Sequence, residues 1–185
     1  MIFQVIFRNR DAIKLFIFHY HTNCLQMLYM VFKQFFIILL TVLVLVSCND
    51  HTQYDQQVTL PESGWFKNEA VKFDLDITDT ITPYNFDITL RYTTNYRYSN
   101  LYIFLITRFP EGKMSRDTIE LMLADPSGKW LGKGWGNVRD DEISLKSPLF
   151  FPQKGHYQFL VQQAMRTDTL REITHVGLRL TTYGY

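Results

Sequence analysis

Cys48 stands in the most distinctive chemical setting of the chain, at the end of the apolar segment "FFIILLTVLVLVSC" and just before a polar stretch. Its thiol, as a thiolate, is a good nucleophile. The apolar run Phe35–Val46 has 12 residues, whereas a transmembrane helix needs about 20. With Lys33 in front of it, this run has the length and charge typical of the hydrophobic region of a secretory signal peptide. We therefore expect residues 30–47 to be a signal peptide.

The four residues Leu45, Val46, Ser47 and Cys48 resemble the bacterial lipobox, which consists of leucine, a variable residue, a small residue and cysteine. In that system the cysteine thiol receives a diacylglycerol, and cleavage then makes the cysteine the new N-terminus. Two or three acyl chains, such as palmitate, anchor a protein stably where a single chain is marginal. We predict this lipid on Cys48 and no other cofactor. The alternative is a signal-anchor helix with an incidental cysteine.

The lipobox divides the chain into segments of different character. A normal signal start occurs at Met30, so residues 1–29 are interpreted as an over-extended reading frame or an unusually long positively charged region. Residues 48–64 are polar and lack helical periodicity, which predicts a flexible tether behind the lipid. The folded domain is expected over residues 65–185.

Composition excludes several classes of function. The formal net charge is +1, which argues against a nucleic-acid partner, because such partners need a clustered basic surface. The only cysteines, Cys24 and Cys48, precede the expected domain, so a disulfide framework is excluded there. No phosphate-binding or dinucleotide-binding fingerprint occurs.

The expected domain shows the period-two alternation of β-strands. Six segments show this pattern or a strongly apolar run: Ala70–Ile77, Tyr84–Thr93, Asn100–Phe109, Asp117–Asp125, His156–Met165 and His175–Tyr183. Short strands separated by turn residues predict an all-β antiparallel sandwich, immunoglobulin-like or jelly-roll, with the latter preferred. A helix over Tyr157–Ile173 is the local alternative, because Gln162–Arg171 does not alternate strictly.

Two aromatic segments are candidate recognition sites. The segment "GKWLGKGWG" contains Trp130, Lys133 and Trp135, and exposed tryptophans beside a cation could bind a protein partner or stack on a glycan. The segment "NYRYSNLY" contains Tyr96 and Tyr98, which could form an exposed patch. The preferred interpretation of both is structural: tryptophans that close the end of the sandwich, and tyrosines that pair across strands.

No residue pattern predicts catalysis or metal binding. The run Asp140-Asp141-Glu142 offers the oxygen ligands that Ca²⁺ prefers, but three successive acids more often form a solvated turn, so we predict no metal site. From Cys48 onward the histidines are His51, His156 and His175, with no Gly-x-Ser-x-Gly motif. Nucleophilic catalysis needs such an activated group, and we predict a protein that is not an enzyme.

Several segments together resemble one family. They are the lipobox, "YRYSNLYIF", "FPEGKMSRDTIELMLADPSGKWLGKGWG" and "YQFLVQQAMRTDTLREITHVGLRL", and they resemble the gliding motility lipoprotein GldH family of the Bacteroidetes over Met30–Tyr185. The resemblance implies a membrane lipoprotein of the cell envelope, at the outer membrane, that is required for gliding motility. It implies contacts with the motility and secretion machinery and carries over no catalytic residue. The alternative is a carbohydrate-binding lipoprotein that uses its aromatic loop.

Overall fold

The computed structural model describes residues 29–38 and 51–184, which belong to two separate units, residues 1–50 and 51–185. In the first unit, residues 29–38 form a helix whose apolar side chains are exposed. This helix covers the start of the expected signal peptide, and the lipobox lies outside the described residues. Among those residues, no helix is long and apolar enough to cross a membrane.

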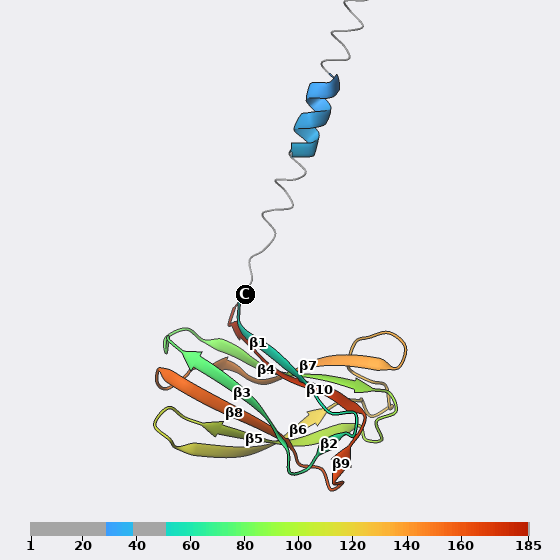
Figure 1. Cartoon of the computed structure of the whole chain (residues 1–185), viewed down its shortest axis with the longest axis vertical. Coiled ribbons are helices and arrows are strands. Elements are labelled where there is room, and N and C mark those ends of the chain that lie inside the picture. Colours follow the sequence, from blue (N-terminus) through green and yellow to red (C-terminus); the bar gives the residue numbers. More distant parts are fainter. Residues whose placement is uncertain (1–28, 39–50, 185) are drawn as a thin grey trace, which may run out of the picture. The chain divides into compact units, whose positions relative to one another are not determined.

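The second unit is a sandwich of antiparallel strands (Figure 1). One sheet, here called the first sheet, has the order β1-β10-β4-β7, and the second sheet has the order β3-β8-β5-β6. A short pair, β2-β9, lies apart from both. The strands are β1 (Thr52–Thr59), β2 (Trp65–Phe66), β3 (Ala70–Ile77), β4 (Tyr84–Thr93), β5 (Asn100–Arg108), β6 (Met114–Met122), β7 (Val138–Leu149), β8 (Gly155–Gln163), β9 (Thr169–Leu170) and β10 (Ile173–Thr182).

The strand order is that of a jelly roll. Successive long strands cross from one sheet to the other, and only the hairpin β5–β6 stays within a sheet. Eight long strands in two sheets with this crossing pattern form a double Greek key. The expected all-β sandwich is therefore confirmed, in its jelly-roll form.

The core lies between the sheets and follows the alternation seen in the sequence. In β3, Val71, Phe73, Leu75 and Ile77 are buried while the residues between them are exposed. Strand β4 contributes five inward side chains from Tyr84 to Tyr92, and the residues between them are half-buried, apart from Asp87, which is buried. Burying one face of each sheet against the other removes apolar surface from water, which is the main favourable term in folding.

Three expectations are corrected by the fold. Residues 48–64 are not all tether, because Thr52–Thr59 form β1, paired with β10, and the folded unit begins at His51. The helical alternative over Tyr157–Ile173 is wrong, because β8 occupies Gly155–Gln163 and pairs with β3 and β5. The acidic run Asp140–Glu142, which we expected in a solvated turn, lies within strand β7 instead.

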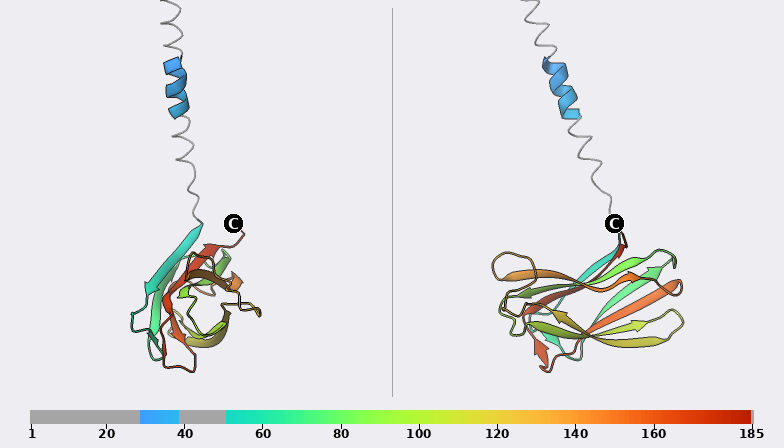
Figure 2. Two further views of the ribbon diagram at one scale, coloured as in Figure 1. Left: turned by 90° about the vertical axis from the view of Figure 1, so that its right-hand side faces the viewer. Right: turned by 180° about the vertical axis from the view of Figure 1, so that it is seen from behind.

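The strands define two ends of the sandwich. At the terminal end lie the start of β1, the end of β10 and the connections 78–83, 109–113 and 150–154. Figure 2 shows the C-terminus beside the start of β1, where the Thr182 amide donates to the His51 carbonyl at 3.1 Å. The opposite end, here called the loop end, carries the connections 60–69, 94–99, 123–137 and 164–172.

Candidate functional site

The loop end contains all five candidate recognition residues. Tyr96 and Tyr98 lie in the connection between β4 and β5, and Trp130, Lys133 and Trp135 lie in the connection between β6 and β7. The fold thus brings two separate sequence segments to one end of the sandwich. The structure then gives the individual side chains different roles.

The connection 123–137 is held by its own hydrogen bonds. Its first part is a turn in which Asp125 Oδ1 accepts bonds from the amides of Ser127 and Lys129, at 2.8 and 3.0 Å. In its second part, Lys133 and Asp140 exchange two backbone bonds at 2.8 and 2.7 Å. Because the backbone groups of Lys133 and Asp140 are paired, the segment continues the β-structure of β7, and the position of its tip is fixed.

The two tryptophans of this segment are in opposite environments. Trp130 is partly buried, with its ring 5.5 Å from the ring of Tyr92. Trp135 is 95% exposed at the tip of the turn. Gly136 follows it with a φ of 61°, a conformation that glycine adopts without steric cost, and a Cβ at Gly134 would overlap the carbonyl oxygen of Val138. The structural interpretation therefore holds for Trp130, whereas Trp135 is displayed to solvent.

Tyr92 connects β4 to this segment. Its hydroxyl donates to the Leu123 carbonyl at 3.1 Å and accepts a bond from the Gly132 amide at 3.3 Å. Burial raises the pKa of Tyr92 to about 12, so the group stays a neutral hydrogen-bond donor. A Cβ at Gly132 would lie 2.8 Å from this hydroxyl. Sequence reasoning missed Tyr92, because it looks like any inward position of a strand.

The tyrosine pair is also divided between packing and surface. Tyr96 is buried, its hydroxyl donates to the Asn100 carbonyl at 3.1 Å, and burial raises its pKa above the usual value. Tyr98 is exposed and meets the Tyr96 ring edge-on at 5.5 Å. The pair forms within one connection rather than across two strands, so the expected cross-strand pairing is wrong, and only Tyr98 presents its ring to solvent.

A polar hollow of about 470 Å³ lies on the outer face of the first sheet, beside Lys133. Arg179 spans it, bonding Asp55 of β1 at 2.6 Å and Glu142 of β7 at 2.8 Å. Arg91 binds Asp140 at 2.7 Å. Arg179 of β10 and Arg91 of β4 thus bind carboxylates of the two outer strands of the first sheet, β1 and β7. In the part of the chain that the structure describes, no group of three or more His, Cys, Asp or Glu residues is placed to hold a metal ion.

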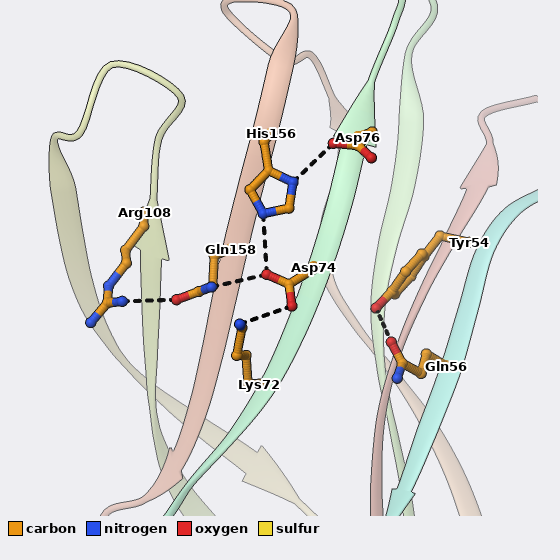
Figure 3. Close-up of polar contacts among 8 residues, drawn as sticks. All are labelled: Tyr54, Gln56, Lys72, Asp74, Asp76, Arg108, His156 and Gln158. Carbon is orange, nitrogen blue, oxygen red and sulfur yellow. Dashed lines mark hydrogen bonds and ion pairs between the residues drawn. The ribbon is translucent and has the colours of Figure 1, made fainter.

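The outer face of the second sheet carries a second polar cluster (Figure 3). His156 on β8 bonds Asp76 through Nδ1 at 2.9 Å and Asp74 through Nε2 at 3.2 Å. Gln158 donates to Asp74 at 2.9 Å and accepts a bond from Arg108 at 2.8 Å. The hydrogen bond to Asp76, followed by that to Asp74, raises the pKa of His156. This cluster can bind a proton reversibly on an open strand face.

An apolar cavity of about 400 Å³ reaches the terminal end of the sandwich. Its lining combines core residues of both sheets with residues of the terminal loops, among them Phe86, Leu105, Phe109, Phe150, Phe151 and Phe159. Sequence reasoning did not single out this end, because its residues come from connections far apart in the chain. The lipidation residue Cys48 and the lipobox residues Leu45, Val46 and Ser47 lie outside the described residues.

Comparison with known proteins gives a family and two close relatives. A family profile described as "GldH lipoprotein" matches residues 52–180. A "Gliding motility lipoprotein GldH homolog" of Christiangramia forsetii is 36% identical over 152 residues, covering 78% of this chain and 93% of the relative. The "Gliding motility lipoprotein GldH" of Flavobacterium johnsoniae is 31% identical over 151 residues, with the same coverage of both chains.

Solved structures are more distant. A carbohydrate-binding module specific for non-crystalline cellulose is 8% identical, covers 71% of this chain and 75% of its own, and superposes with a TM-score of 0.38. A likeness at that score carries no argument about function. The family profile, in contrast, runs from β1 into β10 and so includes nearly the whole sandwich. The chain belongs to the GldH lipoprotein family.

Proposed function

We propose that this protein is a non-enzymatic lipoprotein of the cell envelope that is required for gliding motility. A diacylglycerol and further acyl chains on Cys48 anchor it in the outer membrane, and its sandwich binds proteins of the motility and secretion machinery. Support comes from family membership and from relatives that are named gliding motility lipoproteins. The lipobox sequence supports the anchor.

The observation that carries the binding function is the display of Trp135. Its ring is almost fully exposed at the tip of a hydrogen-bonded segment, and half-exposed Leu131 lies in the same connection. Tryptophan is enriched among the residues that dominate protein–protein interfaces. A rigid segment that presents such a ring loses little conformational entropy on binding, which favours affinity. We assign Trp135, with Lys133 and Tyr98 at the same end, to the partner contact.

The polar clusters favour binding over catalysis. Arg91 and Arg179 are already held by carboxylates of neighbouring strands, so their role is to brace the first sheet. His156 is paired with two carboxylates, but its side chain is 57% exposed and lies on an open strand face. Catalytic groups usually work in concave sites from which water is excluded.

The partner contact is tested by purifying tagged full-length protein from envelopes of the native bacterium. The Trp135→Ala variant should recover less of the motility and secretion proteins than the wild type and should glide more slowly. Tyr102→Ala is the matched control, because Tyr102 is an aromatic residue exposed on strand β5, outside the loop-end connections and the terminal end. Unchanged recovery and gliding with Trp135→Ala would place the contact elsewhere.

The anchor is tested separately with Cys48→Ser. This variant should lose labelling by radioactive palmitate and should leave the membrane fraction, because its thiol is gone. Membrane attachment identical to wild type would contradict the anchor. Binding on a glycan array that disappears in Trp130→Ala and Trp135→Ala variants that remain folded would instead favour the carbohydrate-binding alternative.

A further inference from the structure

We propose that the terminal end of the sandwich rests on the lipid bilayer, with Ile81, Phe150 and Tyr183 inserted among the headgroups. Trp135 and the rest of the loop end then point away from that membrane. This inference rests on the proposed acylation of Cys48, and it adds a second contact with the same bilayer through the folded domain itself.

The chain between the proposed lipid and the folded domain is short. Thr52, the first residue of β1, follows Cys48 by four residues. Four residues reach at most about 14 Å when fully extended. Because β1 starts at the terminal end, this end must stay close to the lipid surface. The loop end lies farther away by the length of the strands, since ten residues of β4 span about 33 Å.

Apolar side chains are exposed at the terminal end. Ile81 is 83% exposed and Phe150 is 55% exposed, and Tyr183 is also exposed. They come from three segments far apart in the chain, and the fold brings them to one end. Branched aliphatic and aromatic side chains in this position favour insertion at a membrane interface, where tyrosine is also enriched.

The segments that carry these residues are held in place by hydrogen bonds and packing. Asp79 Oδ1 accepts a hydrogen bond from the Ile81 amide at 2.8 Å. The Tyr183 amide donates to the Pro83 carbonyl at 2.9 Å, which ties the C-terminal segment to the same connection. Phe150 also lines the apolar cavity at this end. Fixed backbones let these side chains enter a bilayer without first ordering a loose loop.

The charge of this end permits contact with anionic lipids. The three terminal connections contain Lys113 and Lys154, and against them Asp79 and Glu111. With two cations and two anions, these connections carry no net charge that would repel a negative surface. A lipid surface therefore fits this end better than a strongly charged partner would.

The test uses single cysteines in the acylated full-length protein. The mature chain has no cysteine besides Cys48, so Ile81→Cys, Phe150→Cys and, at the loop end, Leu131→Cys can each carry an environment-sensitive NBD label. The proteins are reconstituted in vesicles of phosphatidylcholine and phosphatidylglycerol. We expect nitroxide-bearing lipids to quench the labels at 81 and 150 at least about threefold more than the label at 131, with blue-shifted emission at both terminal positions.

The possible failures are distinguishable. If the labelled proteins float with the vesicles but the label at 81 or 150 stays in water, the docking is wrong and the anchor stands. Quenching that is equal at positions 81 and 131 would also overturn the docking. A blue shift that increases with protein concentration, without quenching by the nitroxide lipids, would show that the terminal end contacts a second copy of this chain and not the bilayer. Absence of flotation, with no lipid on Cys48 by mass spectrometry, would overturn both proposals.

Discussion

At the scale of single residues, the protonation of His156 depends on the two carboxylates that it contacts. Its neighbours Asp76 and Asp74 favour the charged imidazolium and raise its pKa in the folded protein. His175 shows the opposite behaviour, because burial, followed by the charge of Arg91, lowers its pKa. The pKa values of His156 and His175 are therefore shifted in opposite directions from the usual value of about 6.5.

These directions predict how stability depends on pH. A histidine with a raised pKa stabilises the fold fully below about 6.5, and this contribution is lost as the pH rises through the folded-state pKa. His156→Gln should therefore reduce the loss of stability above about pH 6.5, measured by urea unfolding at several pH values. His175→Gln is the control, because its lowered pKa predicts an effect only below about 6.5. A pH profile of His156→Gln identical to wild type would contradict the assignment.

At the scale of elements, the connection between β6 and β7 combines a packed residue with a displayed one. Trp130 closes the loop end of the core by packing on Tyr92, while Trp135 lies at the tip and is almost fully in solvent. The segment is therefore held in place by Trp130, while the ring of Trp135 is free to contact a partner. The stability of this element and its binding should therefore be separable by mutation.

The expected result is a large difference in the free energy of unfolding between two chemically identical substitutions. Trp130→Ala should cost about 2–3 kcal/mol, below the range for a fully buried tryptophan because this ring is partly exposed. Trp135→Ala should change stability by less than about 0.5 kcal/mol. Urea denaturation followed by circular dichroism measures both. Similar losses in the two variants would show that Trp135 also packs against the domain.

At the scale of the whole molecule, β1 is the first strand of the sandwich and follows Cys48 by only a few residues. It is the edge strand of the first sheet, and its Asp55 is bound by Arg179 of β10. Since β1 begins the fold and β10 ends it, both termini are fixed at one end of the jelly roll. Trp135 therefore lies at the loop end, opposite the end at which β1 begins and β10 ends.

Deleting residues 52–59 tests this role, because a tether would be dispensable and a strand is not. We expect the free energy of unfolding to fall by at least about 2 kcal/mol, since the deletion removes a strand and uncovers the edge of β10. An exposed edge also templates pairing with other chains, so light scattering should show self-association. The control inserts a glycine- and serine-rich linker between Asp50 and His51, which should leave stability unchanged. A deletion as stable as the control would restore the tether interpretation.

The sequence by itself determined the features that depend on local pattern. The alternation in β3 and β4 located both strands to the residue, because inward positions must be apolar whatever their partners are. The apolar run before Cys48 and the family resemblance were likewise readable without coordinates. The tertiary structure alone decided the polar edge strands β1 and β7. Their sequences contain few apolar residues. Their backbone groups pair with strands far away in the sequence, β1 with β10 and β7 with β4. It also separated Trp130 from Trp135 and gathered the exposed apolar residues at the terminal end, because burial depends on neighbours that no short stretch of sequence contains.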